Sequence, residues 1–529
     1  MTTIHAVQPL TGAAMAYRNR LGLPPAQALT SVPTARNVTP PPTAPRPTLL
    51  KWPAAVPASE ANERLWDDER AARASFDAIV PALKEIAALQ HDTDFVAQAQ
   101  ALARQRLGFS LPAPLLEDAW VEALDMRRLY AHAVFQTFRR LNQTTLAGLG
   151  AERSRAAEVQ RFFLECGYHL VAVSHCADGR LKGVVRYLLR LPLTAVHREA
   201  FAGTLFDVEE SLRHWSQTEL SRYRAGLPNA ADAGTQYLKI AVYHFSGSDP
   251  EEGCAAHGNN TQVAAQAALD RLTAFREAIE NSYCCGAHVA TLLVGVDTDT
   301  DAIKLHVPDG AGDLSLYRFV DNTAVHAALR TSPGDAHAAI ASALEQAITT
   351  QDGWGRGEGR PSDGMRHLLA YLLENNLRQI EYVHRYHGGR YAEIGHHERF
   401  ISAGNGYSDE QLRNLAYYAR IDTIEEGAAD FDIGVKILSK LNVAHGLPAP
   451  IIIHCGYDAR VPGSRERASA QALRLREAVR ARYAALAQQR FLCIALTLQD
   501  LSRDGRCEFI DADGFDLDSG SSTEQGSQP

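Results

Sequence analysis

Long apolar runs and a surplus of basic charge are both missing from this sequence of 529 residues. No stretch approaches the roughly 20 consecutive apolar residues of a membrane-spanning helix, so we expect no membrane span. The net charge of −9 argues against a general nucleic-acid binder, which carries a basic face. Met1 is not followed by a charged and then an apolar segment, so we expect no secretory signal.

Cysteine is also scarce. Eight cysteines in a chain of this length are too few to crosslink a small secreted fold. We therefore expect a reducing cytoplasm, where the cysteines serve as thiols, metal ligands or buried apolar side chains. The rest of the composition, 46% apolar and 22% charged residues, is typical of a globular chain with several cores.

The two ends of the chain differ in composition from the rest. Residues 1–59 contain no aspartate or glutamate, carry five basic side chains and are rich in proline. Such a segment cannot bury a core, so we predict a disordered basic arm over 1–58. Its composition fits a solvated tail, a docking arm for an acidic protein or, less well because of the prolines, a transit peptide. An Asp-, Gly-, Ser- and Gln-rich end predicts a disordered acidic tail over 511–529.

The ordered part divides into three predicted domains. Apolar residues at helical spacing predict an all-helical domain over 59–150, with helices at 93–107 and 114–146. From residue 151 onward, β-branched runs alternate with helical patterns, which predicts an α/β (α+β) architecture in two units, 151–398 and 399–510. The expected strands are 168–174, 235–243, 290–296, 302–307, 449–454 and 490–497, and the expected helices are 151–166, 207–225, 262–282, 333–350, 364–386, 408–441 and 464–489.

The two α/β units share a short internal echo. The segment 173–180, Val-Ser-His-Cys-Ala-Asp-Gly-Arg, is similar to the segment 453–460, Ile-His-Cys-Gly-Tyr-Asp-Ala-Arg. Downstream, a strand that ends at His244 aligns with one that has Leu498 at the same point. We infer a duplicated unit whose second copy is degenerate and has lost its chemistry.

Five residues of the first copy carry a candidate chemistry: Cys176, Asp178, Arg180, His244 and Cys254. Cys176 and His244 stand at the ends of two predicted strands, which is the edge where open α/β sheets bind ligands. Two thiolates and one imidazole predict a tetrahedral zinc site with one position open for water. A carboxylate beside that water can accept its hydrogen bond, and a guanidinium two residues later can hold the carboxylate off the metal.

These residues resemble the zinc site of the β-class carbonic anhydrases, which use Cys-x-Asp-x-Arg followed by a histidine and a second cysteine. That class usually spaces the later pair as His-x-x-Cys, whereas nine residues separate His244 from Cys254. The wider spacing, the helical block and the degenerate copy resemble one divergent branch, the carboxysome shell carbonic anhydrases. The stretches 395–404 and 441–450 are also similar to that branch, and the resemblance covers about residues 60–510.

The resemblance implies that Cys176, His244 and Cys254 bind one Zn²⁺ per chain. It implies that Asp178 is the proton acceptor for the zinc-bound water and that Arg180 orients it. The zinc-bound hydroxide would attack CO2, and the reverse reaction would dehydrate bicarbonate. By the same resemblance, the enzyme would act in the bacterial cytoplasm inside the carboxysome, where it supplies CO2 to ribulose-bisphosphate carboxylase.

Proton transfer to bulk water calls for a titrating side chain near the zinc site. His396 is a candidate proton relay, and His175 and His257 are two further candidates. We expect the basic arm to dock on the carboxysome shell or on ribulose-bisphosphate carboxylase. We also expect a homodimer or larger homo-oligomer, with no nucleic acid and no membrane as partners.

Two other functions stay open from the residues alone. In the first, His175 or His257 closes a structural zinc site with a fourth ligand, in a non-catalytic shell or scaffold protein. In the second, Cys176 is the nucleophile of a cysteine hydrolase and His244 is its base, but no oxyanion hole is evident and Cys254 then has no role.

Overall fold

The computed structural model describes residue 53 and residues 58–120, 123–145, 149–232, 234–282, 287–332, 334–350, 359–405, 412–421, 424–502 and 507–512. The predicted basic arm and acidic tail lie almost wholly outside these residues and stay predictions. Among the helices within these ranges, none combines the length and the apolar character that a membrane crossing needs.

The amino-terminal block contains helices and no strand in its described residues. These helices are α2 (Ala58–Asp77), α3 (Ile79–Ala88), α4 (Phe95–Arg106), α5 (Ala113–Glu117) and α6 (Met126–Thr145). A single helix over 114–146 is therefore wrong. The reason is a cap, because the carboxylate of Asp125 accepts the backbone N–H of Arg128 at 3.1 Å and begins a new helix.

A six-stranded sheet forms the first α/β unit, in the order β2-β1-β3-β4-β5-β6. Its first four strands in this order are parallel, whereas β5 is antiparallel to both of its neighbours, β4 and β6. The strands are β1 (Tyr168–Cys176), β2 (His197–Phe201), β3 (Gln236–Phe245), β4 (Val289–Asp297), β5 (Ile303–His306) and β6 (Phe319–Asp321). The helices are α7 (Leu149–Glu165), α8 (Val208–Arg224), α9 (Thr261–Ser282), α10 (Asn322–Thr331), α11 (Ala336–Thr349) and α12 (Asp363–His387).

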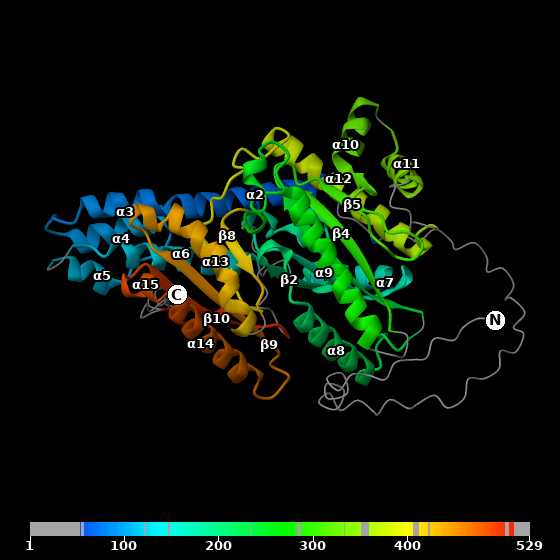
Figure 1. Cartoon of the computed structure of the whole chain (residues 1–529). Coiled ribbons are helices and arrows are strands. Elements are labelled where there is room, and N and C mark those ends of the chain that lie inside the picture. Colours follow the sequence, from blue (N-terminus) through cyan, green and yellow to red (C-terminus); the bar gives the residue numbers. More distant parts are fainter. Residues whose placement is uncertain are drawn as a thin grey trace, which may run out of the picture.

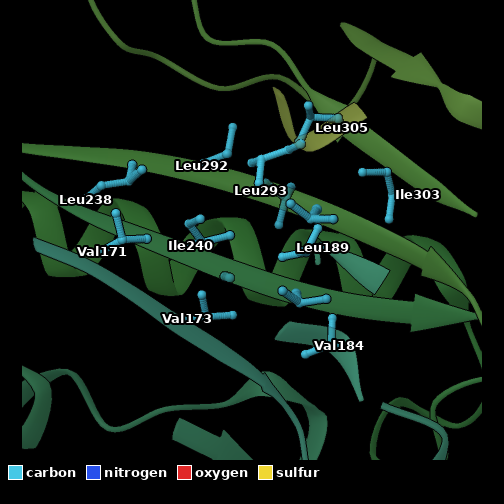
Figure 2. Packing of buried hydrophobic residues seen from close by; sticks show 14 of the residues in the cluster. Val171, Val173, Val184, Leu189, Leu238, Ile240, Leu292, Leu293, Ile303 and Leu305 are labelled. Carbon is cyan, nitrogen blue, oxygen red and sulfur yellow. The ribbon is translucent and has the colours of Figure 1, made fainter. Parts of the chain in front are cut away.

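The central strands are apolar almost throughout because both faces of the sheet are buried. Figure 2 shows Val171 and Val173 of β1 packed with Leu238 and Ile240 of β3, and Leu292 of β4 lies in the same cluster. Parallel strands covered by helices on both faces are apolar almost throughout rather than alternating. This is why 168–174, 235–243 and 290–296 are recognisable as strands in the sequence.

A five-stranded sheet forms the second α/β unit, in the order β11-β10-β9-β7-β8, and β11 alone is antiparallel to its neighbour. The strands are β7 (Phe400–Ala403), β8 (Ala416–Ala419), β9 (Ala449–Tyr457), β10 (Leu492–Asp500) and β11 (Cys507–Asp511), and the helices are α13 (Ile424–Leu441), α14 (Ser464–Arg482) and α15 (Ala484–Gln488).

Part of one predicted helix in this unit is a strand. The helix predicted over 408–441 is wrong in its first half, because Ala416–Ala419 pairs with Phe400–Ala403 as a parallel strand. Both strands have four residues, which is too short for an alternating pattern to stand out, and all eight residues are buried. Among the residues of the predicted range that the structure describes, Ile424–Leu441 are helical.

The helical block covers one face of the second sheet (Figure 1). Ile452 of β9 belongs to the same buried cluster as Phe76 and Phe138 of the helical block. Its neighbours Ile451 and Ile453 point to the opposite face and pack against α13 and α14. The period of two along β9 therefore fixes which helices cover which face of the sheet.

The two sheets meet at their edges. β2 and β8 approach through a bridge between Ala200 and Arg420. The backbone N–H of Tyr418 donates to the carbonyl of Ala177 at 2.9 Å, and Arg198 donates to the Tyr418 hydroxyl at 2.8 Å. These contacts hold β8, and α13 after it, beside the carboxyl end of β1.

Candidate metal centre

Two neighbouring parallel strands deliver the predicted ligands to one place. Cys176 is the last residue of β1, His244 is the second-last residue of β3, and Cys254 lies in the loop that follows β3. Their ligand atoms all lie within 4.8 Å of one another, and the two sulfurs are 4.0 Å apart. The sequence prediction that these three residues converge is therefore confirmed.

The donor set fits a metal ion. All three side chains are buried, and neither ring nitrogen of His244 has a hydrogen-bond partner. A buried imidazole with both nitrogens unpaired costs free energy unless another group satisfies one of them. Two sulfurs and one nitrogen are the soft and borderline ligands that zinc prefers. A cation held between them would satisfy His244 and both sulfurs.

Backbone N–H groups point at both sulfurs. Gly203 donates to the sulfur of Cys176 at 3.3 Å. The hydrogen bond from Cys176 and the backbone N–H groups of Ala256 and His257 together lower the pKa of the Cys254 thiol. Such donors stabilise thiolates, which are the form that binds metals.

The turn that carries Gly203 has a tightly defined shape. Gly203 has φ +65°, and a Cβ at this position would lie 2.8 Å from Nε2 of His257. The His257 ring donates from Nε2 to the carbonyl of Gly203 at 2.9 Å. His257 is thus committed to holding this turn, and it is not part of the group of possible ligands.

Asp178 and Arg180 form the predicted pair beside the ligands. The Asp178 carboxylate accepts from the backbone N and the Nε of Arg180, each at 2.9 Å, and from its second terminal nitrogen at 2.7 Å. Burial would raise the pKa of Asp178, but the charge of Arg180 and the neighbouring His244 hold this pKa well below its usual range. Nε2 of His244 lies 3.7 Å from the carboxylate, so the pair sits directly beside the ligands.

Arg180 is itself fixed from two directions. Its remaining terminal nitrogen donates to the carbonyls of Glu252 and Ile394, both at 2.7 Å. Glu252 precedes Cys254 by two residues, so one guanidinium connects the loop of a ligand to the carboxylate that faces it.

Residues of the second unit complete the cavity next to the ligands. Tyr417 of β8 and Ile433 and Ile437 of α13 line it, together with Ala202 and Ala256 of the first unit. Its volume is about 10 Å³, close to the space that a single water molecule needs. The cavity therefore suits a very small reactant, and Ile433 and Ile437 give it an apolar wall.

The three histidines considered as proton relays have different surroundings. His175 is fully buried, burial lowers its pKa to about 3, and its Nδ1 donates to the carbonyl of Cys176 at 2.7 Å. His257 holds Gly203. His396 lines the cavity and lies close to Asp178 and Glu398. Burial would lower the pKa of His396, but the hydrogen bond to Glu398 and the charge of Asp178 raise it to about 9.

The second unit keeps the echo but not the site. Strand pairing shifts the echo by one residue, because His175 pairs with Val242 and His454 pairs with Thr497, so Gln499 and not Leu498 stands at the place of His244. Neither residue is a histidine, so the ligand that β3 supplies has no counterpart in β10. Asp458 and Arg460 repeat the geometry of Asp178 and Arg180, at 2.9 and 2.7 Å, but on the surface. In the described part of this unit, no group of three possible ligands occurs.

Sequence reasoning missed several residues of the site. Tyr417, Ile433 and Ile437 belong to the other unit, and only the packing of the two sheets reveals them. Gly203 and Glu398 belong to no recognisable sequence motif. The one available signal for Glu398 was its position two residues after His396.

Comparisons with known proteins match one family over most of the chain. Residues 158–396 match the catalytic domain of the carboxysome shell carbonic anhydrase family, residues 397–513 match its carboxyl-terminal domain, and residues 55–146 match its amino-terminal domain.

Curated relatives of this chain bear the name carboxysome shell carbonic anhydrase. The one from Halothiobacillus neapolitanus is 48% identical over 445 residues, which is 83% of this chain and 86% of the relative. The one from Prochlorococcus marinus is 45% identical over 457 residues, covering 85% and 87%. The one from Hydrogenovibrio crunogenus is 44% identical over 448 residues, covering 83% of each chain.

Proposed function

This chain belongs to the carboxysome shell carbonic anhydrases and is a carbonic anhydrase, and from that premise we propose that it interconverts CO2 and bicarbonate at one zinc ion held by Cys176, His244 and Cys254. The observation that carries the proposal is the meeting of two buried thiols and an unpaired imidazole at the ends of β1 and β3. A zinc ion bound there supplies the Lewis acidity that makes water nucleophilic near neutral pH.

The chain's own residues then orient and protect the reacting groups. Asp178 is held as a carboxylate, so it accepts a hydrogen bond from the nucleophilic water and orients it. Arg180 occupies both carboxylate oxygens, which keeps Asp178 from becoming a fourth ligand. Tyr417, Ile433 and Ile437 shield the reactant from bulk water.

His396 is the proposed proton relay between this site and bulk water. It lines the cavity, and its ring is partly exposed, at 22% of the side chain. A relay must reach both sides in this way. The geometry also disfavours the alternative of a closed structural zinc site, because neither His175 nor His257 belongs to the group of ligand atoms that Cys176, His244 and Cys254 form.

We extend the location of the relatives to this chain. Their name places them in the carboxysome shell. The proposed task is to supply CO2 to ribulose-bisphosphate carboxylase there, with the basic arm as the docking segment. Assembly into a homodimer or larger homo-oligomer is part of the proposal, and light scattering of the purified chain tests it.

The metal site has a matched pair of variants. We expect Cys176→Ala to lower the zinc content from one ion per chain to nearly none and to remove CO2 hydration. Cys455→Ala changes the equivalent residue of the second unit, so it should retain zinc and activity. Elemental analysis and stopped-flow hydration measure both. Wild-type zinc and rate in Cys176→Ala would overturn the proposal.

A further inference from the structure

Glu398 is a buried carboxylate that nothing in the reaction described so far uses. It lies in the loop between α12 and β7, and its exposed fraction is 0%. Its Oε1 is 3.0 Å from Nδ1 of His396, while its Oε2 has no hydrogen-bond partner. Among the described residues, no lysine or arginine lies within ion-pair distance of Glu398, so His396 is its one charged neighbour at that range.

The backbone around Glu398 is arranged to admit it. A Cβ at Gly179 would lie 3.0 Å from Oε1 of Glu398 and 2.7 Å from the carbonyl of Ala416. Gly179 stands between Asp178 and Arg180, so the predicted Cys-x-Asp-x-Arg motif needs a residue without a side chain here. The absence of that side chain is what lets Glu398 reach the motif.

The loop that carries both side chains is clamped on two sides. Arg180 donates to the carbonyl of Ile394 at 2.7 Å. Asn414 donates to the carbonyl of Gly395 at 2.7 Å, and its own side-chain oxygen accepts the backbone N–H of His397 at 3.3 Å. The position of His396 relative to Asp178 is thus fixed by the backbone, and the orientation of its ring is fixed by Glu398.

Asp178, His396 and Glu398 form one contiguous group. A ligand atom from each lies within 4.8 Å of the others. A cation is a poor occupant of this group, because Arg180 already fills both oxygens of Asp178 and brings a positive charge. The group is better described as a hydrogen-bonded pair, His396 and Glu398, that lies beside Asp178 at the reaction cavity.

We propose that Glu398 is a positioning residue for proton transfer. Its carboxylate accepts the Nδ1–H of His396, which fixes the tautomer and leaves Nε2 as the nitrogen that exchanges protons with the cavity. The proposal rests on the function proposed above, since it concerns the proton of the same reaction.

The proton balance is simple. Dehydration of bicarbonate consumes one proton, which protonated His396 gives from Nε2 toward the cavity and regains from buffer. Hydration of CO2 releases one proton, which neutral His396 takes up at Nε2 and passes to buffer. Glu398 stays ionised throughout and keeps Nδ1–H in place.

The test separates proton transfer from chemistry. Glu398→Gln keeps the shape, removes the charge and can present an N–H to Nδ1. We expect kcat for hydration to fall about tenfold. The rate of ¹⁸O exchange between CO2 and bicarbonate at equilibrium should stay within about twofold of the wild type, because the interconversion itself needs no proton from bulk. Imidazole in the buffer should restore kcat, since it replaces the relay.

Matched variants complete the design. Glu393→Gln removes a carboxylate of the same loop that pairs with Arg73, and it should leave both rates unchanged. In a His396→Asn background, Glu398→Gln should have no further effect. Should the Gln variant fail to accumulate, Glu398→Asp carries the same expectation, because it withdraws the carboxylate from Nδ1.

Three results would overturn the proposal. They are a wild-type kcat in Glu398→Gln, an equal loss of kcat and exchange in zinc-loaded protein, and an additive loss in the double variant. Failure of the proposed function has a different signature, namely a wild-type chain that holds no zinc or supports no exchange.

Discussion

Arg180 binds both carboxylate oxygens of Asp178, at 2.9 and 2.7 Å, although only one residue separates them in the chain. The turn over Gly179–Leu181 makes this possible, because it brings the Arg180 backbone N–H onto the same carboxylate. Both side chains are buried, so the pair is not screened by water. Because Arg180 occupies both carboxylate oxygens, it keeps Asp178 from binding a metal ion directly.

Removing that arginine should release Asp178. We expect Arg180→Ala to lose about 100-fold or more in CO2 hydration while it retains zinc, because the freed carboxylate competes for the open position on the metal. Arg180→Lys should recover only part of the rate, since an ammonium cannot make two parallel hydrogen bonds. Stopped-flow rates and zinc content distinguish this result from simple metal loss.

The second unit provides the control for this prediction. Arg460 makes the same pair with Asp458, but its side chain is 77% exposed and neither residue belongs to a group of possible ligands. Arg460→Ala should leave zinc and activity at wild-type values. A comparable loss in that variant would mean that the effect of Arg180 is general destabilisation.

Gly203 should be needed for tight metal binding. Alanine at this position must adopt φ +65° and would bring its Cβ to 2.8 Å from His257 and 2.9 Å from Ala256. The turn would have to shift, which withdraws the N–H from the sulfur of Cys176. We expect Gly203→Ala to lose zinc to a chelator at least about tenfold faster than the wild type.

A second glycine serves as a control that separates the backbone strain of a positive φ from the steric contact that a Cβ would make. Gly226 has the same φ of +65°, but a Cβ there would meet nothing within 4 Å. Gly226→Ala should therefore cost stability of about 1 kcal/mol, as αL backbone does for alanine, without a change in zinc release. Equal zinc loss in both variants would contradict the role of the Gly203 turn.

The sequence predicts the ligand set because the chemistry coincides with strand ends. Cys176 and His244 close two β-branched runs that are recognisable from their apolar residues, and parallel neighbours necessarily end at the same edge. The pair Asp178 and Arg180 follows from its local spacing in the same way. Each of these inferences needs only residues that are close together in the chain.

The rest of the site depends on packing that no local pattern encodes. Tyr417 reaches the cavity because β8 meets β2 at Ala200 and Arg420, and β8 itself is too short to be predicted. Which face of α13 would meet the site depends on the same contact. Glu398 is a fully buried acid, and composition alone would place an acid on the surface.

Asp430 should give the protein a measurable pH dependence of stability. Burial raises the pKa of this residue on α13 to about 7. Between about pH 4 and 7 the folded chain therefore keeps a proton that the unfolded chain has lost, so the free energy of unfolding falls as the pH rises. The fall should amount to about 2 to 4 kcal/mol, and Asp430→Asn should remove it.

Thermal midpoints between pH 5 and pH 8 measure this effect. Asp432 is the control, because the hydrogen bond from Arg482 lowers its pKa. Its carboxylate therefore favours the folded state at neutral pH, so Asp432→Asn should destabilise the protein at pH 7, opposite in sign to Asp430→Asn. The same sign in both variants would contradict the assignment.

The basic arm should govern packaging and not catalysis. Residues 1–50 carry Arg18, Arg20, Arg36 and Arg46 with no acidic residue, and the ligand group lies entirely beyond residue 175. A chain that lacks residues 1–50 should therefore hydrate CO2 at the wild-type rate and fail to enter carboxysomes. A full-length chain in which these four arginines are replaced by glutamine separates the effect of charge from the effect of length, and it should also stay outside carboxysomes.

Binding of the wild-type arm to purified shell protein or ribulose-bisphosphate carboxylase should weaken steeply as salt rises, because exposed charges are screened over about 10 Å at 0.1 M. Packaging of the glutamine variant at wild-type levels would show that the arm docks through its apolar or proline residues instead.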